Sequence, residues 1–336
     1  MTNYPYGNKR SVRRRHILMV LLYGAVLLGV LILGFVLDRD KEEEQPTFGS
    51  LEGRFDSDIY KDHDGQTVNY REREITNYLL IGVDQTTLEA SDHQNGGQAD
   101  FLLVLSIDRR HRTITPVMID RDTVTDVATY GIFGDAAGKK EMQICLAQAF
   151  SGRETSGSEN TTRAVTDLLG GVKINHYIAM DESGIPLLND MLGGVSVTLD
   201  DDLTALDPAL KKGETVTLDG AMAEKFVRGR MTVADGSNAS RMERQKVYIK
   251  ALLRQLEIKM EKDSSFMADL LEALDGHVIS DAGENTLIGD VTAYQTYDWQ
   301  PLQMLPGTHE AGEDGFMEFH PDAASMEDMV VEIWFD

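Results

Sequence analysis

The chain has 336 residues, of which 42% are hydrophobic, and it carries 56 acidic against 32 basic side chains. This length and apolar content exclude a wholly disordered chain and allow one large domain or two smaller ones. A net charge of -24 repels the phosphates of nucleic acids, so the composition disfavours a nucleic acid partner.

The first 37 residues predict a membrane anchor. Residues 1–16 hold five basic side chains and no acid, a local charge of +5. Since the whole chain has a net charge of -24, the remaining residues carry a net charge of -29. Residues 17–37 carry no charge, and a helix of that length spans about 32 Å, close to the hydrocarbon thickness of a bilayer. The basic flank places the N-terminus in the cytoplasm. The alternative is a cleaved signal peptide, but its apolar core would be shorter and no small-residue cleavage site follows Leu37.

Beyond the anchor, alternating patterns predict a folded domain. Short apolar runs predict strands buried on both faces at 75–84, 100–108 and 113–120, and further strands at 173–181 and 194–201. Helical patterns lie between and after them at 161–171, 183–194, 219–227 and 240–260. This order favours an α/β fold, a single layered α-β-α domain with a central mixed sheet.

The expected organisation has five parts. A cytoplasmic basic tail (1–16) and a transmembrane helix (17–37) precede an extracellular stalk (38–74). The folded domain covers 75–262, and a C-terminal extension (263–336) packs on it. Within the extension we expect a helix near 264–275 and a strand near 317–321.

An unusual group of basic side chains lies between residues 226 and 245: Arg228, Arg230, Arg241 and Arg244. The first two would project from one face of an extended segment, and the last two share a helix face with Gln245. Ser240 and Glu243 match a capping box that would start the helix at Ser240 and place both helix arginines in its first turn. This pattern predicts a phosphate site, because guanidinium groups and a helix N-terminus both favour anions. The alternative is that these arginines pair with the abundant acids around them.

Acidic residues at strand ends form a second candidate site. Asp84 ends one predicted strand and Asp100 begins the next, so their carboxylates would approach each other at one edge of the sheet. Two close carboxylates beside a phosphate would suit Mg²⁺, although Asp at strand ends also caps turns. Arg121 directly follows a predicted strand and is placed to reach a ligand, although the flanking Asp120 and Asp122 could equally neutralise it. The lone cysteine, Cys145, lies in an apolar stretch and is expected to be a small buried hydrophobe.

Taken together, these stretches resemble the LytR-CpsA-Psr family of cell-envelope proteins over residues 76–246. The matching segments occur in the family's order and include NYLLIGVD, QADFLLVLSID, TITPVMIDRDT, QICLAQAFSG, INHYIAMD, LNDMLGGVSVTL, LDGAMAEKFVRGR and SRMERQ.

The resemblance implies a membrane-anchored extracellular phosphotransferase. Such an enzyme moves an anionic glycopolymer, for example wall teichoic acid or capsule, from a polyprenyl (undecaprenyl) pyrophosphate carrier to peptidoglycan, and holds the lipid in a buried pocket. The resemblance also implies Mg²⁺, or Mn²⁺ in its place, on Asp84 and Asp100. It implies pyrophosphate contacts from Arg121, Arg228, Arg230, Arg241, Arg244 and Gln245. The residues expected to be catalytic are Asp100, Arg121 and Arg241.

Three departures from the family pattern concern the acceptor side. Gln98 stands where the family has Arg, Asp120 replaces a Pro, and Gln143 stands where a basic residue is usual. They motivate an alternative function, a non-catalytic module that binds or regulates polyprenyl phosphates. A further alternative is a polyprenyl pyrophosphatase, in which water attacks the same diphosphate at the same site. A DNA-binding regulator fits badly with a domain of this negative charge.

Overall fold

The computed structural model describes residues 59–336, except 62–64, 73, 85–96, 154, 230–237, 264–265, 284–285, 287–289, 291–292, 295–296 and 314. The expected basic tail, the expected transmembrane helix and the first part of the expected stalk lie outside these residues, as does Arg230. Among the described residues, no helix combines the length and the apolar content needed to cross a bilayer.

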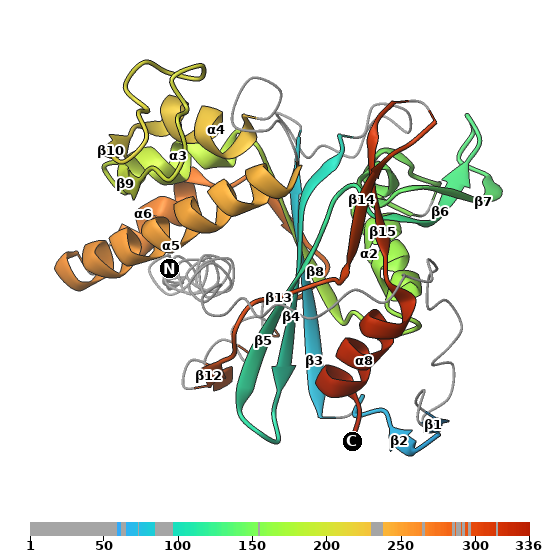
Figure 1. The fold of residues 1–336 in the computed structure, drawn as a ribbon. Helices are drawn as coiled ribbons and strands as arrows, with labels where there is room; N and C mark the ends of the chain where they lie inside the picture. The colour runs from blue at the N-terminus through green and yellow to red at the C-terminus, as the bar shows by residue number, and fades with distance from the viewer. Residues whose placement is uncertain are drawn as a thin grey trace, which may run out of the picture.

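A mixed sheet forms the middle layer (Figure 1). Its long strands β3, β4 and β5 pair antiparallel, β8 adds to β3 in parallel, and short strands extend both edges. The strands are β3 (Ile75–Val83), β4 (Ala99–Asp108), β5 (Thr113–Ile119), β8 (His176–Asp181), β11 (Val278–Ser280), β12 (Asp298–Trp299) and β13 (Gln303–Met304). The predicted strands at 75–84, 100–108 and 113–120 are therefore confirmed.

Both faces of this sheet are buried, as their continuous apolar runs predict. On one face, Leu79 and Ile81 pack with side chains that include Val165 of α2 and Trp334 of α8. On the other face, Leu80 packs in a cluster that includes Met242 of α5. The helical segments are η1 (Ile144–Ala149), α2 (Gly157–Leu168), α3 (Gly184–Met191), α4 (Gly220–Arg228), α5 (Asn238–Lys262), α6 (Phe266–Ala273) and α8 (Ala323–Trp334). The expected α/β fold with a central mixed sheet is confirmed.

Two-stranded hairpins surround the sheet. They are β1 (Ile59–Lys61) with β2 (Thr67–Asn69), β6 (Val124–Tyr130) with β7 (Ala136–Gln143), β9 (Val195–Thr198) with β10 (Thr215–Leu218), and β14 (Gly307–Ala311) with β15 (Met317–Pro321). The β6–β7 hairpin was not predicted, because β7 is exposed over most of its length and its sequence shows no apolar alternation. The predicted strand at 194–201 is β9, which belongs to a hairpin and not to the central sheet.

Residues 263–336 are integrated with the sheet. They supply α6 and β15 close to the predicted positions, and they also supply β11, β12 and β13, which pair with β8 and β5. Helix α8 begins after Asp322, whose carboxylate accepts a hydrogen bond from Ser325 N at 2.7 Å and so caps the helix. The segment predicted as an extension therefore completes both the sheet and one helical layer.

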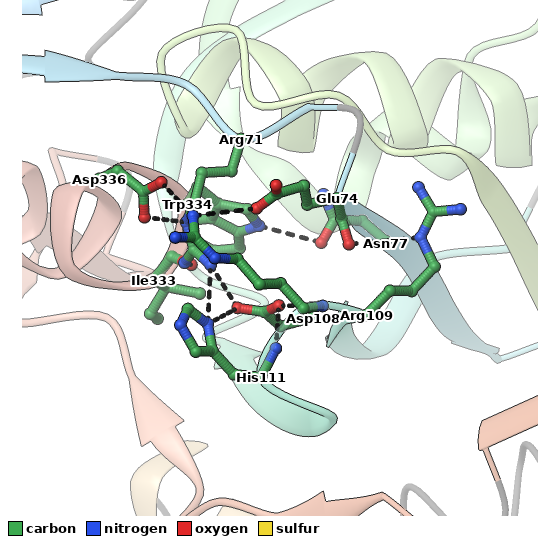
Figure 2. Close-up of polar contacts among 10 residues, drawn as sticks. Arg71, Glu74, Asn77, Asp108, Arg109, His111, Ile333, Trp334 and Asp336 are labelled. Atoms are coloured by element: carbon green, nitrogen blue, oxygen red, sulfur yellow. Dashed lines mark hydrogen bonds and ion pairs between the residues drawn. The ribbon is translucent and has the colours of Figure 1, made fainter.

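A buried arginine fastens the end of α8 to the sheet (Figure 2). Arg71 Nη1 donates to the Asp108 carboxylate, and Arg71 Nη2 donates to the carbonyl of Ile333 at 2.5 Å. The indole N–H of Trp334 donates to Asn77 Oδ1 at 2.9 Å. These contacts join the last turn of α8 to β3 and β4.

Asp108→Asn is expected to remove an acid-sensitive part of the folding free energy. Burial raises the pKa of the Asp108 carboxyl, but hydrogen bonds from His111 and Arg71 more than offset it and lower the pKa to about 2. Because this folded-state pKa lies below the unfolded value of about 3.9, the carboxylate stabilises the fold above about pH 4. That contribution, about 2 kcal/mol, is lost as the pH falls through about 2.

Urea unfolding at a series of pH values between about 5 and 2 checks this expectation. The decline in unfolding free energy should be shallower in Asp108→Asn than in the parent chain. The matched control is Asp135→Asn, because Asp135 pairs with Arg153 at the surface and should leave the decline unchanged. Equal declines in parent and Asp108→Asn would contradict the assignment.

Candidate functional site

Asp100 lies between two buried guanidinium groups at one end of the central sheet. Its Oδ1 accepts a hydrogen bond from Arg121 Nη1, and its Oδ2 accepts one from Arg241 Nη1 at 2.9 Å. The Asp100 side chain is 21% exposed, whereas those of Arg121 and Arg241 are 11% and 4% exposed. The structure thus brings together three residues that the sequence predicts in one site.

Asp84 lies beside this cluster. The antiparallel register of β3 and β4 pairs Val83 with Ala99, so Asp84 emerges at the end of the sheet where Asp100 begins. Asp84 Oδ1 accepts a hydrogen bond from Gln98 N at 2.5 Å. Burial raises the pKa of Asp84, the hydrogen bond lowers it, and the charge of Asp100 raises it further. The two carboxylates approach each other at one sheet edge, as the strand-end positions predict.

Arg121 is held from several sides. Its Nη2 donates to Gln98 Oε1 and lies 3.0 Å from Cys145 Sγ, and its Nε lies 3.2 Å from Asp122 Oδ1. Burial raises the pKa of the Cys145 thiol to about 12, although the positive charge of Arg121 opposes the rise. The thiol is therefore protonated at neutral pH, which agrees with the prediction of a buried, non-nucleophilic cysteine.

The C-terminal hairpin supports the turn that carries this arginine. Asp120 Oδ2 lies 2.7 Å from His309 Nε2 of β14. Gln143 Nε2 donates to Asp122 Oδ1 at 3.3 Å and to the carbonyl of Met317 at 2.6 Å. Two of the three departures from the family pattern, Asp120 and Gln143, thus make specific contacts with residues 307–321.

Arg228 reaches the cluster from a helix, so the predicted extended segment is wrong at this position. The Asp219 carboxylate caps α4 by accepting from Met222 N, and Arg228 is the last residue of that helix. Arg228 Nη2 lies 2.7 Å from Glu182 Oε2, and Nη1 donates to Glu224 Oε1 at 2.8 Å. Arg228 and Glu224 lie four residues apart, so their pairing supports the last turn of this helix.

Arg244 occupies the junction between α4 and α5. Helix α5 begins at Asn238, two residues before the predicted start at Ser240, so Arg244 lies in its second turn and not in the first. The Ser240 hydroxyl accepts a hydrogen bond from Arg244 Nη1 at 3.2 Å. Arg244 also donates to the carbonyls of Phe226, at 3.3 Å, and of Gly229. These contacts fix the two helices to each other, and an anion contact by Arg244 stays a prediction.

An almost entirely apolar pocket of about 120 Å³ opens next to the cluster. Two neighbours of cluster residues line it: Phe101 follows Asp100, and Gln245 lies one helical turn after Arg241. The full lining is Leu80, Ile81, Gly82, Phe101, Met180, Ile185, Leu188, Val227, Gln245, Tyr248 and Leu252. The pocket and the charged cluster therefore share the same strands and the same face of α5.

Sequence reasoning missed Glu182. The parallel register pairs Val83 with Asp181, so Glu182 emerges beside Asp84 at the same end of the sheet. Its side chain is 16% exposed, and burial raises its pKa, Arg228 lowers it, and nearby carboxylates raise it again. The sequence offered one signal for Glu182, an acidic residue directly after a predicted strand. It does not show that this strand, β8, pairs with β3.

The carboxylates allow a limited metal site. Within the described ranges, no group of three or more His, Cys, Asp or Glu side chains is arranged to hold a metal ion. Mg²⁺ needs only one or two protein carboxylates and completes its shell with phosphate oxygens and water. The donor set of Asp84 and Asp100 is therefore chemically suited to Mg²⁺ in the presence of a phosphate ligand, and the metal assignment stays a prediction.

Comparisons with known proteins settle the family. The sequence profile of the LytR_cpsA_psr family matches residues 49–332. The chain belongs to the LytR_cpsA_psr family. The matched residues include every described member of the cluster and the pocket, so the resemblance read from the motifs is confirmed.

Individual members of the LytR_cpsA_psr family are distant relatives. The polyisoprenyl-teichoic acid–peptidoglycan teichoic acid transferase TagU of Bacillus mycoides is 25% identical over 275 residues, covering 80% of this chain and 81% of that protein. Protein gbs0355 from Streptococcus agalactiae has a TM-score of 0.60 at 19% identity, covering 78% of this chain and 88% of that one. The structure described as "TagT bound to LI-WTA" has a TM-score of 0.56 at 17% identity, covering 78% and 90%. The two structures establish that the fold is shared.

Proposed function

We propose that this chain is a phosphotransferase that moves an anionic glycopolymer from a polyprenyl pyrophosphate carrier to peptidoglycan outside the membrane, to which residues 17–37 anchor it. The observation that carries the proposal is the adjacency of the buried charged cluster and the apolar pocket. A lipid diphosphate has a strongly anionic head joined to an apolar chain, and these two sites match its two parts. The name of the TagU relative describes a transfer of this class.

The arginines would bind the diphosphate. A guanidinium has five N–H donors in a fixed fork, so an arginine that pairs with Asp100 through Nη1 keeps donors for phosphate oxygens. Arg121 and Arg241 are largely buried, and charge pairs are stronger where water is excluded. In this arrangement Asp100 sets the positions of both guanidinium groups before the substrate arrives. Mg²⁺, when bound to Asp84 and Asp100, would neutralise phosphate charge and act as a Lewis acid.

The transfer needs a base for the acceptor hydroxyl. The acceptor oxygen would form a bond to the phosphorus of the polymer phosphate while the anhydride bond to the lipid phosphate breaks. Asp84 suits the role of base by position, because it lies beside Asp100 at the same end of the sheet and its carboxylate accepts a hydrogen bond from Gln98 N at Oδ1. Asp100, which the sequence analysis placed among the catalytic residues, accepts from two arginines and suits a positioning role better.

The pocket would hold the start of the polyprenyl chain. Its volume of about 120 Å³ is below the range of about 300–1,000 Å³ typical of small-molecule sites. The polyprenyl chain would therefore have to separate α5 from the sheet or extend past the pocket rim.

An assay with the full-length chain tests the proposed reaction. Lipid-linked glycopolymer and peptidoglycan fragments are incubated with and without Mg²⁺, and the products are separated. Polymer linked to peptidoglycan, formed only with the divalent ion, is the expected result. Free polymer phosphate would instead indicate a pyrophosphatase, and lipid binding without any product would indicate a non-catalytic module.

Glu182→Gln is expected to strengthen binding of a polyprenyl diphosphate about three- to tenfold, which corresponds to about 0.6–1.4 kcal/mol. The substitution removes a half-buried negative charge beside Arg228 and leaves that guanidinium for the anionic head. Binding is measured by calorimetry with the full-length chain. Glu224→Gln is the matched control, because Glu224 pairs with the same arginine from a more exposed position and should have a smaller effect. Weaker binding in Glu182→Gln would show that Glu182 instead holds Arg228 in place.

A further inference from the structure

One face of the central sheet changes from apolar to polar along its length. On β4, Val104 is fully buried in the core, and the next two residues on that face are Ser106 and Asp108. Opposite them on β5 are Thr115 and Thr113, each in direct cross-strand register. Four polar side chains thus form a patch where the same face carries core residues a few positions earlier.

A cavity of about 560 Å³ lies over this polar patch. Helix α8 and the segment 300–303 form its walls, and its size is within the range of about 300–1,000 Å³ that small ligands occupy. Gln300 and Gln303 contribute amide groups, while Met329 and Pro301 contribute apolar surface. The cavity lies at the opposite end of β4 from Asp100, about 27 Å away at about 3.4 Å per residue.

The charges around this cavity disfavour an anionic ligand. The Arg71 guanidinium is already engaged by Asp108, by the carbonyl of Ile333 and by Asp336, whose Oδ1 lies 3.3 Å from Nε (Figure 2). Glu332 adds a further acid to the lining. A phosphate or a carboxylate would therefore meet more negative charge than positive charge among the described lining residues.

The hydroxyl groups of the patch are open to a ligand. Ser106 is 2% exposed, Thr113 and Thr115 are half-buried, and the side chains of all three make no hydrogen bond to other described residues. Buried polar groups without partners destabilise a fold unless water or a ligand satisfies them. Hydroxyl and amide groups that both donate and accept, set beside an apolar wall, match a ligand that is rich in hydroxyl groups.

We propose that this cavity binds a sugar unit that is neutral or carries an ammonium group. The hydroxyls of Ser106, Thr113 and Thr115 and the amides of Gln300 and Gln303 bind its hydroxyl groups, and Glu332 favours an ammonium group at the rim. The proposal concerns binding alone and does not depend on the proposed transfer. The cavity is then a sugar-binding site separate from the charged cluster, at the opposite end of β4.

Ligand-observed saturation-transfer NMR on the full-length chain tests the class of ligand. The detergent must lack a sugar head group, because an alkyl maltoside would compete for the cavity. The probes are oligomers of N-acetylglucosamine, of glucosamine and of galacturonic acid, which are neutral, cationic and anionic. We expect saturation transfer to the first two and none to the third. Absence of transfer to both expected ligands, or equal transfer to the anionic oligomer, would overturn the proposal.

A double variant, Ser106→Ala with Thr115→Val, locates the binding. It should weaken binding of the neutral oligomer about tenfold or more, the effect of losing roughly 1.4 kcal/mol. Its melting temperature should stay equal or rise, because the hydroxyls it removes make no hydrogen bond to other described residues. Thr217→Val in the remote β9–β10 hairpin is the matched control and should bind as the parent does. Unchanged affinity in the double variant would place the sugar elsewhere and overturn the proposal.

Two single variants complete the test. Glu332 is exposed, so Glu332→Gln should leave the stability of the fold unchanged. The variant should weaken binding of the glucosamine oligomer and leave binding of the neutral oligomer unchanged. Arg241→Gln, in the charged cluster, should leave sugar binding unchanged even where glycopolymer transfer fails. Loss of sugar binding in Arg241→Gln alone would assign the sugar to the cluster and contradict the proposal.

Discussion

Replacing Arg241 with glutamine is expected to reduce glycopolymer transfer about 10²–10³-fold, the usual cost of removing one donor that stabilises charge in a buried site. The loss has two physical sources. The side chain is 4% exposed and donates to Asp100 at 2.9 Å, so its positive charge acts where water is largely excluded. Among the described residues, its removal also leaves Arg121 as the one cationic side chain paired with the Asp100 carboxylate.

Initial rates and diphosphate affinity, measured on the same preparations, check this expectation. Arg254→Gln is the matched control, because Arg254 lies on the exposed side of the same helix and should retain the parental rate. Arg241→Lys keeps the charge but loses the guanidinium fork, so we expect an intermediate rate. If a folded Arg241→Gln chain transferred glycopolymer at the parental rate, the result would contradict a role for the cluster in the proposed reaction.

Ile185→Trp is expected to lower affinity for a long-chain polyprenyl diphosphate about 100-fold while affinity for inorganic pyrophosphate changes less than about twofold. Ile185 lines the pocket and is only partly buried, so the larger side chain can fill the cavity without disturbing the fully buried core. Filling it would exclude about three or four methylene groups of the lipid, each of which contributes about 0.8 kcal/mol.

The two ligands separate the roles of the pocket and the cluster. Calorimetric titration of each ligand gives the two affinities, and thermal unfolding shows whether the variant stays folded. Leu187→Trp, on the same helix at a position 37% exposed, adds the same bulk outside the pocket and should bind both ligands as the parent does. A parallel loss of both affinities in Ile185→Trp would mean that the substitution disturbs the cluster, and unchanged lipid affinity would refute the assignment of the pocket.

The strand framework could be predicted because its signals are local. The apolar runs around Leu80, Leu103 and Val117 are short, rich in branched residues and bounded by turn residues, which is typical of buried strands, and their ends position Asp84, Asp100 and Arg121. The approach of Asp84 to Asp100 followed from two consecutive strands that form an antiparallel pair. The direct contact of Arg241 with Asp100, across 141 positions, was not predicted, because no local pattern specifies it.

Non-local pairing explains what the sequence could not show. Glu182 enters the site only because β8 adds to β3 in parallel, and no local pattern specifies that neighbour. Arg228 was placed on an extended segment because its spacing from Arg230 suggested one, yet the helix begun at Asp219 continues to it. The role of residues 263–336 was also hidden, since strands as short as Asp298–Trp299 carry too few residues for a period to be recognised.

The chain has one cysteine, and its sulfur rests against the guanidinium of Arg121 in the buried cluster. A thiol-modifying reagent can therefore meet Cys145 only when the site opens to solvent. The rate of that modification therefore measures how often the site opens to solvent, and the measurement needs no engineered label. Any molecule that binds over the cluster should lower the rate of Cys145 modification, so a screen for ligands can use the parental sequence.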